Sequence, residues 1–181
     1  MRETDKIPPA VLARLRALKA LIMDVDGVLT DGGITIDDQG RESKTFHVRD
    51  GHGLKLLRRT GFQLALLTGR YSRVVELRAA ELGIETVYQK ALDKVAAYEE
   101  IRERFGLEDR QIAYLGDDLV DIPVMRRVGF AATVADGIEA MDQVAHWRTS
   151  RPGGRGAVRE LCELILRTQG TWEQVTGRYF G

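Results

Sequence analysis

Short apolar runs alternate with amphipathic segments along most of the chain. The apolar runs predict strands over residues 20–25, 63–67, 86–89, 111–115 and 131–134. Between them, apolar residues recur at helical spacing and predict helices over residues 54–59, 72–82, 94–105 and 119–128. Because strands alternate with helices, the pattern predicts an α/β fold, in which helices cover both faces of a doubly wound parallel sheet.

One segment breaks this alternation. Residues 33–48, "GITIDDQGRESKTFHV", hold two alternating runs around a polar turn near Gly40, and they predict a β-hairpin that projects after the first strand. With 181 residues, the chain is most simply one domain over residues 1–181. Residues from about 167 to 181 are expected to form a loose C-terminal tail.

Charge and composition exclude several classes of partner. Lys plus Arg (27) balance Asp plus Glu (27), so no overall basic field attracts nucleic acid or an anionic membrane. The single cysteine, Cys162, suits a reducing cytosol and lies on the apolar side of a helical pattern, as expected for a core thiol. Residues 1–20 mix both charge signs without a sustained apolar core, so neither a signal peptide nor a membrane span is predicted. A cytoplasmic protein is expected.

Polar residues gather where the predicted strands end. Asp24 and Asp26 close the first strand, "TGR" (68–70) follows the second, "QKALDK" (89–94) the third and "GDDLVD" (116–121) the fourth. Singly, each has an ordinary explanation as a cap, a turn or a solvated lysine. Doubly wound sheets bind ligands beyond the carboxyl ends of their strands, so we expect these groups to share one crevice. Carboxylates crowded there would repel one another without a cation, which favours a hard divalent metal, with magnesium as the leading candidate.

The spacing of these residues favours phosphoryl transfer. In extended chain, Asp24 and Asp26 would leave the same side of the strand about 6–7 Å apart. One carboxylate could then attack phosphorus while the other reaches the leaving oxygen, so Asp24 is the candidate nucleophile and Asp26 the candidate acid and base. Lys94 begins a helix after the N-cap candidate Asp93, where a cation opposes the helix dipole. A nearby anion explains that position better than an exposed, solvated lysine does.

The ordered motifs "DVDG", "LLTGR", "DK" and "GDDLVD" resemble the four motifs of the haloacid dehalogenase superfamily. Together with "FHVRDGHG" and "GGRGAVRE", they are similar over residues 21–166 to its 3-deoxy-D-manno-octulosonate 8-phosphate phosphatases. The resemblance implies a Rossmann-like hydrolase that uses Mg²⁺ and an aspartyl-phosphate to release phosphate from this small sugar acid. It also implies a place in lipopolysaccharide precursor synthesis. Composition and periodicity alone predict only an α/β domain with a phosphate and metal site.

The resemblance assigns roles to individual residues. Asp24 would be nucleophile and metal ligand, the backbone carbonyl of Asp26 a second ligand, and Asp117 the third. Thr68 and Lys94 would hold the transferring phosphoryl group. Asp121 and Asp118 would lie behind the ligands, where they orient the metal's waters or Lys94. The implied substrate contacts are the "VRDG" loop (Val48, Arg49, Asp50, Gly51) with Lys55, Gly69, Arg70 and Arg78.

Two histidines do not fit this assignment. His47 stands where the resemblance leads us to expect asparagine, so no substrate contact is assigned to it. His47 and His52 also lack the further ligands that a zinc site requires.

Segment lengths bear on assembly. Only 41 residues separate Asp26 from Thr68, and 25 separate Thr68 from Lys94, so no cap domain fits. An aspartyl-phosphate enzyme needs a partly enclosed site, and a neighbouring subunit would supply the missing walls. The resemblance implies a homotetramer with hairpins at its centre. In it, "GGRGAVRE" would carry Arg155 into the next subunit's site. A flexible turn before the last helix explains that segment equally well.

Three other functions remain open. Phospho-aspartate receiver switches share acidic residues, Thr and Lys, but they carry an adjacent acid pair on the first strand, which "DVD" does not match. Phosphatases of nine-carbon sugar-acid 9-phosphates look similar, although "RDG" after the hairpin favours the eight-carbon substrate. A non-catalytic lobe that drives oligomerisation would not need the complete acidic and basic set.

Overall fold

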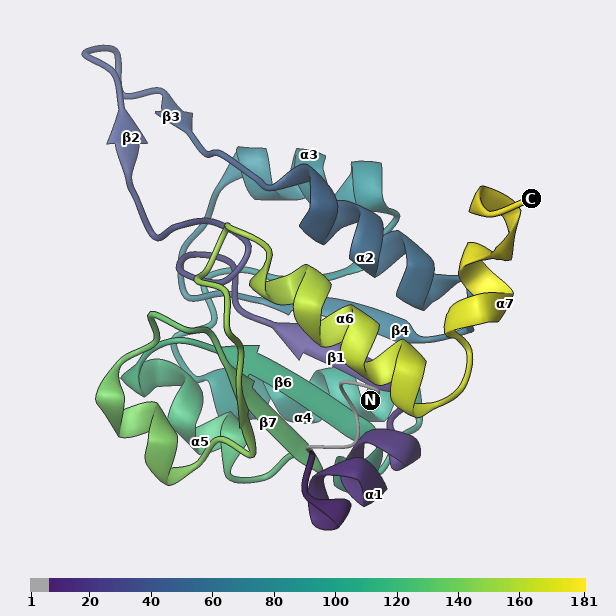
Figure 1. The fold of residues 1–181 in the computed structure, drawn as a ribbon. Helices are drawn as coiled ribbons and strands as arrows, with labels where there is room; N and C mark the ends of the chain where they lie inside the picture. The colour runs from purple at the N-terminus through teal and green to yellow at the C-terminus, as the bar shows by residue number, and fades with distance from the viewer. Residues whose placement is uncertain (1–6) are drawn as a thin grey trace.

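The computed structural model describes residues 7–181, and a six-stranded sheet in the order β5-β4-β1-β6-β7-β8 forms its centre (Figure 1). The strands are β1 (Ala20–Met23), β4 (Gln63–Leu67), β5 (Thr86–Tyr88), β6 (Ile112–Gly116), β7 (Phe130–Thr133) and β8 (Trp147–Arg148). All neighbouring pairs are parallel, and Leu21 of β1 is in register with Leu64 of β4 and Ala113 of β6. The predicted parallel α/β sheet is confirmed.

The topology puts the crevice of this sheet at β1. From β1 the sheet extends one way through β4 and β5, and the other way through β6, β7 and β8. Such a reversal of strand order opens a crevice beyond the carboxyl ends of the central strands, where a doubly wound sheet binds its ligand. Loops that follow β1, β4 and β6 therefore border one site.

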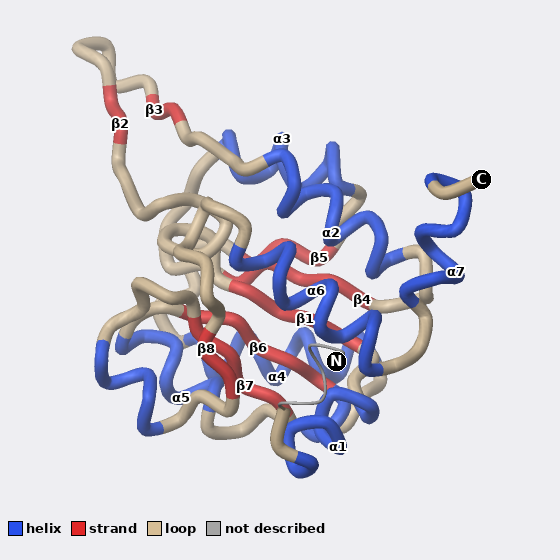
Figure 2. The backbone as a smooth tube through the Cα atoms, viewed as in Figure 1, coloured by secondary structure: helices blue, strands red, loops and turns tan. Residues whose placement is uncertain are grey.

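Helices cover both faces of the sheet, as Figure 2 shows with red strands between blue helices. Leu21 and Met23 of β1 pack with α1 (Pro9–Ala17), α2 (Val48–Arg58), α3 (Arg73–Leu82) and α6 (Ala157–Thr168). Ile22 points the other way and packs with α4 (Lys94–Phe105) and α5 (Ile122–Met125). Alternate β1 residues thus enter two separate cores, which is why the whole strand is apolar.

The predicted hairpin is confirmed. Thr35–Ile36 (β2) and Glu42–Ser43 (β3) form an antiparallel pair that projects from the body of the molecule (Figure 1). Asp37 closes the turn, because its side chain accepts hydrogen bonds from the Gln39 and Arg41 amides. The return arm runs from β3 into α2, so the hairpin is attached to the body of the molecule at both ends, through the loop after β1 and through α2.

Two predicted helices have the wrong bounds. α2 begins at Val48 rather than at residue 54, so the "VRDG" segment is the first turn of a helix and not a loop. Gly51 and Gly53 weaken the helical signal there, although Asp50 suits the positive end of the helix dipole. The predicted helix 119–128 is instead a 3₁₀ turn, Leu119–Asp121, followed by the short α5, which has proline in its first turn.

Several elements were not predicted from the sequence. These are α1, the edge strand β8, the 3₁₀ turns Asp109–Gln111 and Glu139–Gln143, and, after α6, α7 (Trp172–Thr176) with the turn Gly177–Tyr179. The guanidinium of Arg167 lies 4.2 Å from the ring centroid of Trp172, which ties α7 to α6. Within residues 7–181, no helix has the length and apolarity to cross a membrane. The predictions for the amino terminus fall partly on residues 1–6, outside the described residues.

Candidate active site

Asp24 leaves the end of β1 and is held on both carboxylate oxygens. Oδ1 accepts a hydrogen bond of 2.6 Å from the Val25 amide, and Oδ2 accepts one of 2.6 Å from Nζ of Lys94. Lys94 is the first residue of α4, where Asp93 caps the helix as predicted by accepting from the Val95 and Ala96 amides. The side chain of Asp24 is only 9% exposed, so its charge depends on these partners rather than on water.

Asp121 is a second carboxylate that binds Lys94. Its Oδ1 lies 2.7 Å from Lys94 Nζ and accepts a 2.6 Å hydrogen bond from the buried hydroxyl of Tyr114. Its Oδ2 accepts from the backbone amides of Asp117 and Asp118, at 3.0 and 3.3 Å. Both oxygens are therefore engaged by protein donors, which suits a residue that orients its neighbours.

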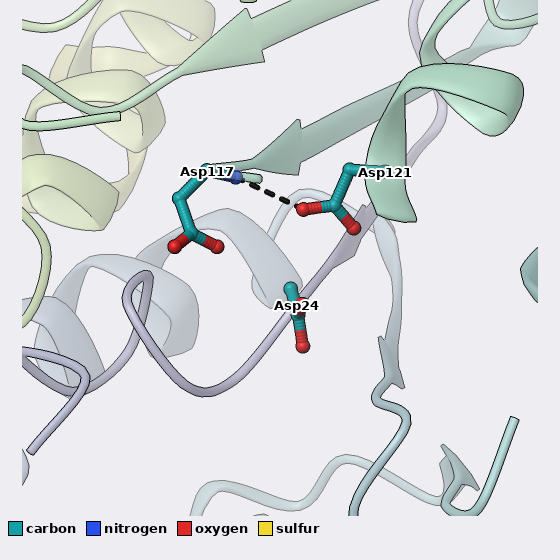
Figure 3. Close-up of side chains that lie close together, drawn as sticks. All are labelled: Asp24, Asp117 and Asp121. Carbon is teal, nitrogen blue, oxygen red and sulfur yellow. Dashed lines mark hydrogen bonds between the residues drawn. The ribbon is translucent and has the colours of Figure 1, made fainter. Parts of the chain in front are cut away.

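Asp117 completes an acidic cluster at the end of β6. One ligand atom from each of Asp24, Asp117 and Asp121 lies within 4.8 Å of the others, and Figure 3 shows the three residues close together. Oδ1 of Asp117 is buried and has no hydrogen-bond partner. A buried carboxylate oxygen without a donor is costly, and a hard cation with oxygen ligands removes that cost. The donor set therefore fits Mg²⁺.

The pKa values of the cluster also favour a bound cation. Burial, followed by repulsion from Asp121, raises the pKa of Asp24 to about 6, although Lys94 opposes the shift. Burial, with Asp121 and Asp24 next, raises the pKa of Asp117 to about 7. Burial disfavours the ammonium of Lys94, but Asp24 and Asp121 more than compensate, so its pKa is raised. The lysine charge alone does not satisfy the carboxylates, and a second cation would.

Gly27 allows the loop after β1 to pass beside this cluster. Its φ is +85°, and a Cβ atom there would lie 2.1 Å from Oδ2 of Asp117. On the other side of the loop, a Cβ on Gly153 would lie 1.8 Å from the Gly27 carbonyl oxygen, and the Gly154 amide donates to Val28 O at 2.9 Å. The "GGRG" segment thus packs on the loop of its own chain.

Asp26 faces the hairpin and not the acidic cluster. β1 pairing ends at Met23, so Asp24 and Asp26 lie in a loop and the expected same-side geometry of a strand does not apply. Nζ of Lys44, on the return arm of the hairpin, lies 2.5 Å from Oδ1 of Asp26. Nε of Arg70 lies 3.7 Å from Oδ2. Of the predicted substrate contacts, Arg70 is the cation that the fold brings to Asp26.

Thr68 occupies the end of β4 and is 3% exposed. Its amide donates to Tyr88 O and its carbonyl accepts from Ala91, which fixes the backbone between β4 and β5. Gly69 follows it in the loop, half-buried. Asp118 is exposed and caps the next turn by accepting from the Leu119 amide at 2.7 Å, so it lies at the rim of the acidic cluster.

The remaining predicted substrate contacts are dispersed over the chain. Arg49 and Arg155 line a cavity of about 900 Å³, which also contains His47 and His52. Arg155 pairs with Asp31 of its own chain at 3.2 Å. Lys55 lines a separate depression of about 380 Å³ beside α3.

Three further predicted substrate contacts, Asp50, Gly51 and Arg78, pack against other parts of the protein. Arg78 lies over the ring of Phe46 and pairs with Glu81 at 2.8 Å, and Gly51 packs directly under its guanidinium. The buried carboxylate of Asp50 accepts from the amides of Gly156 and Arg159 at the start of α6. Val48, in contrast, is 78% exposed.

Sequence reasoning missed Tyr114, Lys44 and Glu42. Tyr114 reads as one more apolar residue of β6, yet its hydroxyl binds Asp121. Lys44 and Glu42 lie in an alternating hairpin run in which polar residues normally face solvent. The only signal in the sequence was their position near the first motif, which does not by itself give a contact.

Comparisons with known proteins agree with this geometry. Residues 49–129 match the family model of haloacid dehalogenase-like hydrolases. The chain is 45% identical to 3-deoxy-D-manno-octulosonate 8-phosphate phosphatase KdsC of Yersinia pestis over 92% of this chain and 89% of the relative. It is 41% identical to the Escherichia coli K12 enzyme of that name, over 93% and 89%.

A solved structure of a relative has nearly the same fold as this chain. It is the 3-deoxy-D-manno-octulosonate 8-phosphate phosphatase of Moraxella catarrhalis, in complex with magnesium ion, phosphate ion and KDO molecule. The two share 38% identity and a TM-score of 0.91, over 98% of this chain and 99% of that one. The chain is a phosphomonoesterase, and it belongs to the 3-deoxy-D-manno-octulosonate 8-phosphate phosphatase family of haloacid dehalogenase-like hydrolases.

Proposed function

We propose that the chain hydrolyses 3-deoxy-D-manno-octulosonate 8-phosphate to the free sugar acid and phosphate, with Asp24 as nucleophile. The observation that carries the proposal is the buried contact of Lys94 with both Asp24 and Asp121, next to Asp117. This arrangement occurs in a chain 45% identical to a phosphatase of that name. It provides a nucleophile, a cation for the phosphoryl oxygens and an acidic pocket for a metal.

The proposed first step transfers the phosphoryl group to Asp24. A carboxylate oxygen of Asp24 bonds to phosphorus while the bond from phosphorus to the sugar oxygen breaks. Asp26 gives its proton to that oxygen, which leaves as the sugar hydroxyl. Lys94, with Thr68 at the end of the neighbouring strand, stabilises the negative charge on the phosphoryl oxygens.

The proposed second step restores the enzyme. Asp26, now a carboxylate, takes a proton from water as the water oxygen attacks phosphorus. The bond between phosphorus and Asp24 breaks, phosphate is released, and Asp24 is again a carboxylate. Asp26 is suited to both steps, because it is half-buried and lies outside the acidic cluster, where solvent and a leaving group can reach it.

We further propose Mg²⁺ as the cofactor. Asp24, Asp117 and the backbone carbonyl of Asp26 would hold it, and when bound it supplies positive charge that offsets the carboxylates and the phosphoryl oxygens. The unpartnered Oδ1 of Asp117 supports this assignment, as does the magnesium in the Moraxella relative's structure. Asp121, whose oxygens already accept from protein donors, would orient Lys94 and the Asp117 backbone.

The assembly and cellular setting are also part of the proposal. A homotetramer with hairpins at its centre would let substrate contacts come from a neighbouring copy. Exposed Arg49 and Lys55 on α2 support this, since each lines a surface hollow that does not include the acidic cluster of its own chain. The proposed setting is lipopolysaccharide precursor synthesis in the cytoplasm, and light scattering of the purified chain tests the tetramer.

The decisive experiment measures phosphate release from eight- and nine-carbon sugar-acid phosphates, with Mg²⁺ and with EDTA. The eight-carbon 8-phosphate is expected to have the highest kcat/KM, only with Mg²⁺. Asp24→Asn should remove turnover while its circular dichroism stays unchanged. Preference for a 9-phosphate would replace the substrate assignment, and no release from any sugar acid would favour a binding switch or an oligomerisation lobe.

A further inference from the structure

Lys44 is a buried cation on an otherwise exposed hairpin. It follows β3, its side chain is 1% exposed, and its Nζ lies 2.5 Å from Oδ1 of Asp26 and 3.3 Å from Oε1 of Glu42. Removing an ammonium group from water is unfavourable unless anions replace the lost hydration. The contact with Asp26 is therefore a fixed feature of the site and not a chance surface ion pair.

The two oxygens of Asp26 have different surroundings. Oδ1 accepts the hydrogen bond from Lys44. Oδ2 lies 3.7 Å from Nε of Arg70, which is beyond hydrogen-bond distance, and Arg70 instead donates to Glu42 at 3.2 Å. Among the described residues, Glu42 thus connects both cations, and Oδ2 is the oxygen left available for a proton.

We propose that Lys44 is a positioning residue, which fixes the Asp26 carboxyl group so that Oδ2 exchanges protons with the reacting oxygens. This inference rests on the proposed role of Asp26. Oδ2 gives its proton to the sugar oxygen as the P–O bond breaks, and later takes one from the attacking water. The terminal torsion of Asp is broad, so without the Lys44 contact the carboxyl group would sample orientations that do not reach the leaving oxygen.

The inference predicts a dependence on the leaving group. A sugar alkoxide is a poor leaving group and needs the proton from Asp26, whereas p-nitrophenolate leaves readily without one. General acid catalysis contributes about 10²–10⁴-fold, so loss of its alignment should remove part of that factor only where a proton is needed. A purely structural role for Lys44 would slow both substrates alike.

The test compares kcat/KM of Lys44→Met for the sugar-acid phosphate and for p-nitrophenyl phosphate. This constant reports the steps up to release of the alcohol, whereas kcat also contains the attack of water, which both substrates share. We expect kcat/KM for the sugar phosphate to fall by about 10–100-fold, a part of the general-acid factor, with a much smaller fall for the nitrophenyl ester. Arg41→Met, an exposed cation of the same hairpin that pairs with Asp37, is the matched control and should match the parent for both substrates.

Two further variants make the result decisive. Asp26→Asn should show the same leaving-group selectivity more strongly; if it does not, the acid role in the proposed function fails. If Asp26→Asn shows this selectivity, but Lys44→Met slows both esters equally or slows neither, the positioning role of Lys44 is overturned. Should Lys44→Met fail to fold by circular dichroism, Lys44→Arg gives the same test. It keeps a buried donor, so a smaller but still selective loss supports the proposal, and a loss that is equal for both esters refutes it.

Discussion

Nζ of Lys94 lies 2.6 Å from Oδ2 of Asp24 and 2.7 Å from Oδ1 of Asp121, so that one ammonium group links the ends of β1 and β6 to the start of α4. The side chain of this lysine is only 3% exposed, and it contacts two of the three carboxylates of the acidic cluster. This contact therefore stabilises the folded protein, and it is also the contact that the proposed chemistry uses.

Replacement of Lys94 by Met should impair both turnover and stability. Loss of one electrostatic stabiliser of a transition state lowers kcat by about 10²–10³-fold. Removing one member of a buried ion pair costs about 3–5 kcal/mol, because the carboxylates stay buried without their cation. Phosphate release and urea unfolding measure the two effects. Lys19→Met, an exposed lysine at the opposite end of β1, is the control, and equal behaviour of the two variants would contradict the assignment.

Mg²⁺ should stabilise the protein more at pH 8 than at pH 5.5. Asp24 and Asp117 have folded-state pKa values of about 6 and about 7, above the usual 3.8. Their stabilising contribution without metal is complete below pH 3.8 and is lost as pH rises through 6 to 7, when both become charged. A metal binds only the charged forms, so protons compete with it at pH 5.5.

Differential scanning fluorimetry with and without Mg²⁺ measures this effect. At 100 times Kd, a ligand stabilises the folded state by about 2.7 kcal/mol, which gives a Tm rise of several degrees. Asp117→Asn should abolish the rise at pH 8. Asp118→Asn is the matched control, because Asp118 is exposed and caps a turn, so the rise should persist. A rise that is equal at both pH values would refute the metal assignment.

Gly27→Ala should damage the site far more than Gly32→Ala. Both glycines have positive φ, +85° and +78°, so alanine is strained at either position by about 1 kcal/mol. Only at Gly27 does the added methyl meet Asp117 Oδ2, at 2.1 Å, whereas at Gly32 the nearest atom is 3.7 Å away. We expect Gly27→Ala to lose both turnover and the Mg²⁺-induced Tm rise. Gly32→Ala should keep both, and similar losses in the two variants would exclude the steric explanation.

Local signals made much of the site predictable from the sequence. The helix at Lys94 is predicted by an apolar periodicity and by Asp93, whose capping role depends on neighbours two and three residues away. Asp24, Thr68 and Asp117 directly follow apolar strands, and parallel topology brings the ends of those strands together. Each inference needed only contacts near in sequence or a general rule for parallel sheets.

Contacts between distant segments were not predictable in the same way. Lys44 reaches Asp26 across 18 positions because the hairpin folds back, and an alternating polar run does not encode where its arm lies. The resemblance places Asp50 among the substrate contacts because it lies in "VRDG", yet its carboxylate accepts hydrogen bonds at the start of α6, more than 100 positions away. The start of α2 was missed because Gly51 and Gly53 lower helix propensity while the tertiary packing of the helix overrides them.

Arg155→Ala tests the proposed contact between subunits. Arg155 forms an exposed pair with Asp31 that is worth at most about 1 kcal/mol, so stability should hardly change. If the arginine binds substrate, kcat/KM falls, and an unchanged value would contradict that role. Mixing unfolded Arg155→Ala and Asp24→Asn chains and refolding them together discriminates further. Activity should return only if Arg155 of one chain serves Asp24 of another, whereas a site complete within one chain gives no recovery.

Asp50 provides the sharpest contrast between a structural and a functional residue. Its buried carboxylate accepts from the Gly156 amide at 3.2 Å and from the Arg159 amide at 2.7 Å, at the start of α6. Asp50→Ala leaves both donors buried without an acceptor, which costs about 1–3 kcal/mol in urea unfolding. Asp50→Asn keeps one acceptor oxygen and the side-chain volume, and should lose less.

Kinetics of the two Asp50 variants then separate the roles. If the carboxylate is only structural, kcat/KM should fall only where the variant unfolds. The Asn variant then retains most of its turnover at a temperature where it is folded. A direct contact with substrate predicts that the Asn variant keeps its stability but loses kcat/KM. Since the carboxylate is 1% exposed and both of its oxygens already accept from backbone amides, the first outcome is expected.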